Sequence, residues 1–201
     1  PLLRPTLATP GLPLSSLPVP EPAERERLLG LANDTGLELP GADARLDELV
    51  LDRAARSPDA TALLWSGGSL TYGALVARAE ALARRLAAAG AGPGRLVGLH
   101  LPKGPAQAIG ALAVLRTGAA YLPLDPALPA ARLAYLLEHG EVRQLVTSAA
   151  LDTAGDWPPD LARLVPPEPA DEAAWARAPW GPLRPPGPAA RPGPTSDLAY
   201  V

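Results

Sequence analysis

The fold is decided by the stretch Leu115-Arg116-Thr117-Gly118-Ala119-Ala120-Tyr121-Leu122-Pro123-Leu124-Asp125-Pro126. A helical pattern precedes it and ends at Gly118, because glycine readily adopts the positive φ found just past a helix C-terminus. The short apolar run from Ala119 to Leu122 then predicts a strand. The sequence Pro-Leu-Asp-Pro closes that strand with a turn. A helix followed by a strand in this order is typical of α/β folds.

Strand and helix patterns alternate on both sides of this stretch. Strands are predicted at Leu96 to Leu101, Ala119 to Leu122 and Gln144 to Thr147, and helices at Pro105 to Arg116 and Pro129 to His139. The alternation implies parallel pairing through right-handed crossovers. We therefore expect an α/β fold with a parallel layered sheet flanked by helices. The side chains expected to face the sheet are Ile109, Leu112, Ala113, Leu115, Leu133, Leu136 and Leu137.

The preceding part of the chain predicts two helices separated by a hairpin. The first helix covers Leu46 to Ser57 and Asp43 is expected to cap it; Leu46, Leu49, Val50, Arg53 and Ala54 follow helical spacing. Two strands, Thr61 to Trp65 and Ser69 to Thr71, flank Gly67-Gly68, where two glycines supply the positive φ of a tight turn.

The second helix, Tyr72 to Ala89, has the clearest pattern in the chain. Thr71 is expected to cap its start and Gly90 its end. Its apolar face is formed by Leu75, Ala79, Leu82 and Leu86. We expect the arginines of this helix to lie away from that face, namely Arg78, Arg84 and Arg85.

The two ends of the chain are rich in proline. Residues 1–22 read as an extended linker, because proline fixes φ and removes a backbone donor, and Glu21 to Asn33 predicts a short charged helix. We expect a linker at 1–40 and a larger domain at 41–201. After Ala150 regularity fades: Leu161 to Val165 is a possible edge strand, and the rest reads as a long surface connection. That connection is anchored by Trp157, Trp175 and Trp180.

Composition excludes several classes of function. A net charge of −3 offers no basic field for nucleic acid. No apolar run is long enough for a membrane span and no signal peptide is evident. The absence of cysteine removes disulfides, thiol nucleophiles and thiolate metal sites, which fits a cytoplasmic protein. The chain has no methionine and begins at Pro1, and Asp197 to Val201 reads as the first half of a strand, so we expect an excised fragment. Removal of an initiator methionine before Pro1 is the alternative explanation for the start.

Four residues are candidates for a functional site. His100 and His139 end a strand and a helix; no second ligand lies at a metal-ligand spacing, so structural roles are the simpler interpretation. Lys103 follows a strand and could meet an anion there, but a solvated turn lysine is the simpler interpretation. Asp125 has no partner for acid–base chemistry and is expected to accept backbone hydrogen bonds in its turn, or to cap the next helix.

No glycine cluster has the context of a phosphate-binding loop. Gly67-Gly68 leads into a strand, and the cluster from Gly90 to Gly94 follows a helix and precedes a strand. The phosphate loop needs the reverse order, from strand into helix. The alternating charges of Glu24 to Arg27 are interpreted as a solvated helical face. The sequence therefore yields no catalytic, cofactor-binding or metal-binding residue.

Several stretches resemble, in order, the adenylation domains of nonribosomal peptide synthetases. Leu29 to Asn33 resembles the end of the linker helix after a condensation or cyclisation domain, and Leu46 to Leu49 with Ser57 to Leu63 resembles the opening of an adenylation domain. Ser69 to Leu75 resembles its first core motif and Val114 to Pro126 its second. Asp197 to Val201 resembles the residues before the third, a phosphate-binding loop. The pair Lys103-Gly104 resembles a variant in members that follow cyclisation domains, which often activate cysteine.

The resemblance implies a parent domain that uses ATP and Mg²⁺ to convert an amino acid into an aminoacyl-adenylate. It also implies transfer to the phosphopantetheine thiol of a carrier domain, with an upstream condensation or cyclisation domain and the remainder of the adenylation domain as partners. The family motifs that bind nucleotide and metal have no counterpart in this sequence, so we expect the fragment alone to be inactive. The alternatives are a docking or scaffold module, half of a split enzyme, and an acid–thiol ligase similar to acyl-CoA synthetases.

Overall fold

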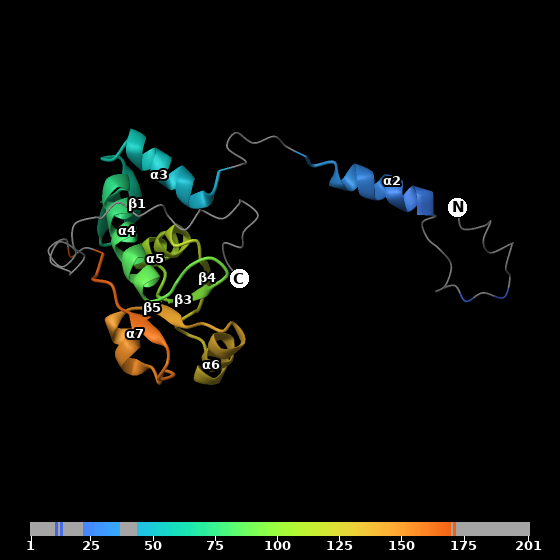
Figure 1. The fold of residues 1–201 in the computed structure, drawn as a ribbon. Helices are drawn as coiled ribbons and strands as arrows, with labels where there is room; N and C mark the ends of the chain where they lie inside the picture. The colour runs from blue at the N-terminus through green and yellow to red at the C-terminus, as the bar shows by residue number, and fades with distance from the viewer. Residues whose placement is uncertain (1–10, 12, 14–21, 37–43, 170, 172–201) are drawn as a thin grey trace. The chain divides into compact units, whose positions relative to one another are not determined.

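The structure, a computed structural model, describes residues 11, 13, 22–36, 44–169 and 171 (Figure 1). Several sequence predictions fall outside these residues: most of the proline-rich linker, the cap at Asp43, the anchors Trp175 and Trp180, and the strand at Asp197 to Val201. The chain divides into two compact units, Pro1–Ala42 and Asp43–Val201, which are described separately.

The first unit contains one described helix, α2 (Pro22–Asn33). None of its residues is buried, and the leucines Leu28, Leu29 and Leu31 are exposed. The predicted charged helix is confirmed over these bounds. Proline at the first position suits a helix start, because the missing N–H would have no partner inside the helix there.

The second unit begins with α3 (Leu46–Arg56), a hairpin of β1 (Thr61–Trp65) and β2 (Gly68–Thr71), and α4 (Tyr72–Ala88). The strands pair antiparallel, and Gly68 alone of the two turn glycines has a positive φ, of 151°. Thr71 caps α4, because its Oγ1 accepts a hydrogen bond from the Ala74 N–H at 3.2 Å. The predicted N-cap is therefore confirmed. At the other end of α4 the C-cap residue is Ala89, and the predicted Gly90 follows it with φ 94°.

A four-stranded sheet forms the rest of the second unit. Along the chain it contains β3 (Leu96–His100), α5 (Pro105–Arg116), β4 (Ala120–Pro123), α6 (Ala130–His139), β5 (Gln144–Thr147), α7 (Ala149–Ala154) and β6 (Ala162–Leu164). The strand order is β4-β3-β5-β6 and every pair is parallel. The predicted parallel α/β fold is confirmed, and so is the edge strand after Leu161. The short helix α7, capped by Ser148, was not predicted.

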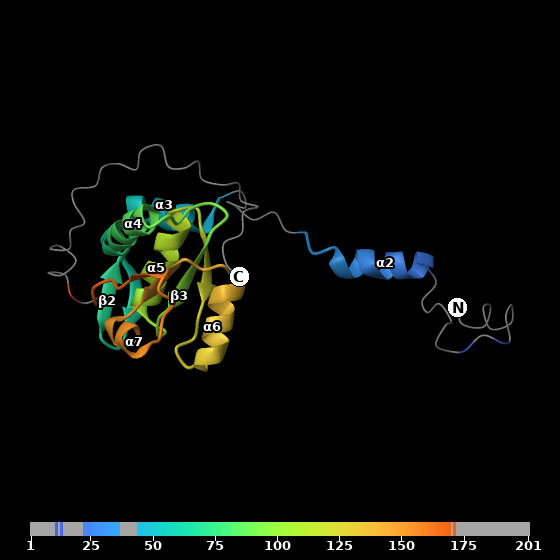
Figure 2. The same ribbon diagram turned by 60° about the horizontal axis from the view of Figure 1, so that its bottom comes forward.

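Two hydrophobic clusters cover the two faces of this sheet. The larger cluster joins α4 and α5 to Val97 and Leu99 of β3 and Val146 of β5. The smaller joins α6 to Leu122 of β4 and Leu145 of β5. Figure 2 shows α6 on one side of the sheet and α4 with α5 on the other. The sheet is therefore covered by helices on both faces, as expected for parallel strands.

The orientation predicted for one arginine of α4 was wrong, and the apolar spacing noted in α3 does not mark its buried face. In α3 the leucines Leu46 (59% accessible) and Leu49 (47%) are exposed, whereas Asp47 and Ala54 are buried. In α4, Arg78 is only 7% accessible, and its Nη1 donates a hydrogen bond to the carbonyl oxygen of Pro169. In both helices a charged side chain has a buried partner, which an apolar pattern does not reveal. Leu115 of α5 is half-buried, and Val114 is buried instead.

None of the described helices has the length and apolar character needed to cross a bilayer.

Candidate functional site at the carboxyl edge of the sheet

The carboxyl ends of the strands are where a doubly wound sheet normally binds its ligand. Here β3 lies between β4 and β5, so the chain passes from β4 across β3 to reach β5. The switch point is therefore between β3 and β5, where His100 is in register with Thr147. On the other side of β3, Leu99 is in register with Pro123, the last residue of β4. Lys103 and His100 lie at this edge, where β3 ends.

Lys103 lies just past β3 and its side chain is exposed. Gly104 is the N-cap residue of α5, with extended backbone and no side-chain hydrogen bond, and Pro105 is the first helical residue. These residues form a strand-to-helix turn with one cation. A phosphate cradle requires several backbone N–H groups converging with that cation. The interpretation of Lys103 as a solvated turn residue stays a prediction.

Asp125 is exposed, and its Oδ1 accepts a hydrogen bond from the Ala127 N–H at 2.9 Å. This is the backbone contact in the turn that was one of the two roles expected for it. It does not cap the next helix, because the N-cap position of α6 is Pro129. The carboxylate therefore shapes the turn that closes the signature stretch, Leu115 to Pro126.

The two histidines have different surroundings. His100 is buried; its Nδ1 lies 3.3 Å from the carbonyl oxygen of Leu124, and its ring meets the Trp157 ring edge-on at 5.5 Å between centroids. His139 is exposed and stacks on Tyr135 one helical turn earlier. Neither lies in a group of three or more His, Asp or Glu residues that could hold a metal, as far as the described residues extend.

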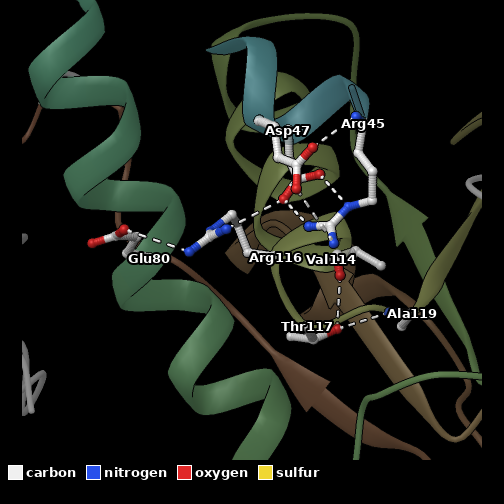
Figure 3. Close-up of polar contacts among 8 residues, drawn as sticks. Arg45, Asp47, Glu80, Val114, Arg116, Thr117 and Ala119 are labelled. Carbon is white, nitrogen blue, oxygen red and sulfur yellow. Dashed lines mark hydrogen bonds and ion pairs between the residues drawn. The ribbon is translucent and has the colours of Figure 1, made fainter. Parts of the chain in front are cut away.

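A second polar cluster, which sequence reasoning missed, joins α3 to α5 and α4. Arg45, just before α3, contacts Asp47 through both ends of its guanidinium: Nε to Oδ1 at 3.0 Å and Nη2 to Oδ2 at 2.6 Å. Arg116 of α5 donates from Nη1 to the Asp47 Oδ2 at 3.3 Å, and its Nη2 lies 4.0 Å from the Glu80 Oε1. Figure 3 shows both guanidinium groups turned toward Asp47, with Glu80 on the far side of Arg116.

Helical spacing was the signal that could have revealed Asp47. It precedes Val50 by three residues and Ala54 by seven, so it shares the face of α3 that these two occupy. The backbone N–H of Arg45, at the start of this helix, also has a partner: it donates a hydrogen bond to the Glu48 carboxylate at 2.9 Å. Asp47 is 1% accessible and held by two arginines. A buried carboxylate in this position neutralises two partly buried cations and has no room to act on a substrate.

The turn after Arg116 is fixed by Thr117 and Gly118. The Thr117 Oγ1 donates to the Val114 carbonyl at 2.7 Å and accepts from the Ala119 N–H at 3.3 Å, as Figure 3 shows. Gly118 has φ 79°, and a Cβ there would lie 3.1 Å from the Pro93 Cγ. The signature stretch is therefore held by ion pairs before the turn and by hydrogen bonds within it. Every contact here is structural and none presents a reactive group.

Comparison with known proteins identifies the framework. Residues 50–201 match the family described as AMP-binding enzyme, which is most of the chain. The chain belongs to the AMP-binding enzyme family. The resemblance seen at Ser69 to Leu75 and Val114 to Pro126 is therefore confirmed.

Curated relatives of this AMP-binding chain are peptide synthetases. The chain is 39% identical over 150 residues to tyrocidine synthase 3 of Brevibacillus parabrevis, covering 75% of this chain and 2% of the relative. It is 43% identical over 150 residues to the phosphinothricin tripeptide synthetase PhsB of Streptomyces viridochromogenes, covering 73% and 12%. The chain thus spans a small part of the length of these relatives.

A solved structure of a peptide synthetase also resembles this chain in fold. The crystal structure of the nonribosomal peptide synthetase FmoA3 with AMPPNP bound superposes with a TM-score of 0.69 and is 31% identical. The superposition covers 88% of this chain and 18% of that one. The chain is a partial AMP-binding region of the kind found in nonribosomal peptide synthetases.

Proposed function

We propose that this chain supplies the opening framework of an amino-acid-adenylating domain in a nonribosomal peptide synthetase. The parent domain would join ATP and an amino acid into an aminoacyl-adenylate, release pyrophosphate, and pass the aminoacyl group to the thiol of a carrier domain. The observation that carries the proposal is the likeness to FmoA3 with AMPPNP bound, at 31% identity over 88% of the chain. We assign residues 1–40 to a linker and 41–201 to the adenylation domain.

The described residues do not fit ATP and Mg²⁺ by themselves. No group of three carboxylates or histidines that could hold a metal occurs in the described part of the chain. Lys103, the cation at the carboxyl edge, is exposed beside a helix start without a side-chain cap. We propose that the groups that contact nucleotide and metal belong to other parts of the parent domain, and that these 201 residues position them.

Amino-acid-dependent exchange of pyrophosphate into ATP tests this proposal on the 201-residue chain. We expect no exchange with any of the twenty amino acids, and no saturable binding of Mg·ATP in a calorimetric titration. A matched Lys103→Ala variant separates specific from background signal, because it removes the cation at the strand-to-helix turn. Exchange by the unaltered chain that this variant lacks would show that the framework contains a nucleotide site.

The partners follow from the same proposal. We propose that the chain works with an upstream condensation or cyclisation domain, a carrier domain bearing phosphopantetheine, and the remainder of the adenylation domain, in the cytoplasm. The pair Lys103-Gly104 supports a cyclisation-type neighbour and cysteine as the amino acid. The peptide synthetases among its relatives favour an amino-acid substrate over the fatty or aryl acids of an acid–thiol ligase.

Two alternatives predict different behaviour in reconstitution. A split enzyme predicts that a second chain carrying the complementary part of the domain restores pyrophosphate exchange. A docking module predicts stable binding to such a chain without exchange. The reading frame downstream of Val201 distinguishes both from the proposed continuous domain, which requires it to continue into a Ser/Thr/Gly-rich loop.

A further inference from the structure

Two polar side chains interrupt the apolar layer between the sheet and α6. In β5, Leu145 belongs to the cluster on the α6 side and Val146 to the cluster on the opposite side. Successive side chains of a strand point to opposite faces. Thr147 therefore points to the same side as Leu145, toward α6. It is 0% accessible.

His100 lies on that same side of the neighbouring strand. A Cβ on Gly98 would lie 2.6 Å from the Leu145 Cδ1 and 3.1 Å from the Leu124 Cδ1, so position 98 faces the α6-side cluster. His100 is two residues further along β3 and faces the same way. Its register partner is Thr147, and Trp157, which packs against the α6-side cluster, meets the imidazole edge-on. The histidine and threonine are thus neighbours on adjacent strands, and the indole ring contacts the histidine.

The Thr147 hydroxyl has an unmet hydrogen-bonding requirement. Its Oγ1 is buried and has no hydrogen-bond partner among the residues that the structure describes. A buried hydroxyl without a partner costs free energy, and folded proteins usually satisfy such groups with protein atoms or ordered water. Valine has the same shape without that cost, so an unsatisfied threonine here would be less stable than valine.

The hydrogen bond of His100 fixes which ring nitrogen remains available. Nδ1 faces the Leu124 carbonyl oxygen, which can only accept, so Nδ1 must carry the proton in that contact. In the neutral ring Nε2 is then an acceptor. A hydroxyl donor and an imidazole acceptor on register-paired residues are two suitable partners for one water molecule, which needs between two and four.

We propose that a single buried water molecule binds between Thr147 and His100 at the switch point of the sheet. It accepts the hydrogen bond of the Thr147 hydroxyl and donates one to the His100 Nε2. Together with the bond from Nδ1 to the Leu124 carbonyl, it links the end of β5 through β3 to the turn that closes the signature stretch. His100 is accordingly a positioning residue for that turn, under the cover of Trp157.

The direction in which one substitution changes the stability distinguishes a site that binds water from a site with an unsatisfied hydroxyl. If water is bound, Thr147→Val removes its donor, and we expect the urea midpoint of unfolding to fall, while Thr147→Ser stays near the parent value. If no water is bound, Thr147→Val removes only a penalty and the midpoint rises or stays level, which would overturn the proposal. Thr61→Val is the matched control, because Thr61 is exposed in β1.

Nitrogen-15 NMR of the unaltered chain tests the proposal without any variant. The chain has only two histidines, so exposed His139 is an internal reference for His100. We expect His100 to hold the Nδ1–H tautomer, and we expect an exchange cross-peak between long-lived water and the Thr147 side chain. An Nε2–H tautomer, or the absence of that cross-peak, would refute the bridge.

Discussion

Oδ2 of Asp47 lies 3.3 Å from Nη1 of Arg116, a residue 69 positions further along the chain. This contact fastens α3, the first helix of the larger unit, to the end of α5 that leads into the signature stretch. Arg45 approaches the same carboxylate from the other direction, so one buried acid balances two arginines. This carboxylate is therefore a buried polar contact between α3 and α5, beside the apolar packing of Val50 against the core.

Replacing Asp47 by asparagine is expected to destabilise the chain strongly. Asn keeps the shape but removes the charge. Arg45 and Arg116 then lose the buried carboxylate that they share and keep only the more distant carboxylates of Glu48 and Glu80. Breaking a buried pair in this way costs about 3 kcal/mol. The measurement is the free energy of unfolding from urea titration, followed by circular dichroism. A loss below the error of the titration would mean that water compensates both arginines.

The matched control lies on the same helix. Asp52 pairs with Arg56 one turn later, and both side chains are more than half exposed. Exposed pairs of this kind contribute about 0.5 kcal/mol or less. Asp52→Asn should therefore leave the urea midpoint nearly unchanged, so the contrast with Asp47→Asn isolates the effect of burial from that of charge.

Gly98→Ala should disturb the middle of the sheet. The new Cβ would lie 2.6 Å from the Leu145 Cδ1, and Leu145 is fully buried and cannot move aside freely. Overpacking of this kind costs about 1–3 kcal/mol. Gly92→Ala is the comparison, because nothing lies within 4 Å of a Cβ there. Equal unfolding free energies for the two variants would contradict the close approach of β3 and β5.

Gly118→Ala should weaken the signature turn. The residue has φ 79°, which costs about 1 kcal/mol for a residue with a Cβ, and the added carbon meets Pro93. Gly118→Asn should lower the stability less than Gly118→Ala, although asparagine is larger, because asparagine tolerates positive φ better than other side chains. If alanine is tolerated as well as asparagine, the strain is not conformational. Thermal unfolding of both variants decides between these outcomes.

Gly155→Ala tests how Trp157 covers His100. A Cβ at position 155 would lie 2.3 Å from the Trp157 Cε2, so the indole must move. Its Nε1 donates to the Asp152 carbonyl at 3.0 Å, and this bond should be lost with the movement. We expect the His100 ring protons to lose their ring-current shift in NMR spectra, with a stability loss of about 1 kcal/mol. Unaltered His100 shifts would show that the indole stays in place.

The local sequence pattern was enough to predict most helices and strands and some of the residues that cap them. The strands at Leu96 to Leu101 and Gln144 to Thr147, the cap at Thr71, and the glycine stop at Gly118 all depend on neighbouring residues, so sequence reasoning could find them. The helix α7 was missed because six residues give too short a period to recognise.

The sequence by itself determined that this chain is α/β, that the strands from Leu96 onward run parallel, and which stretches carry the family resemblance, because periodicity and turn chemistry act over a few residues. Only the tertiary structure decided that Asp47 and Arg78 are buried, and that His100 lies under Trp157 beside Thr147. Those contacts join residues far apart in the chain. A charge or a hydroxyl becomes buried where a distant partner meets it, and no local pattern specifies that partner.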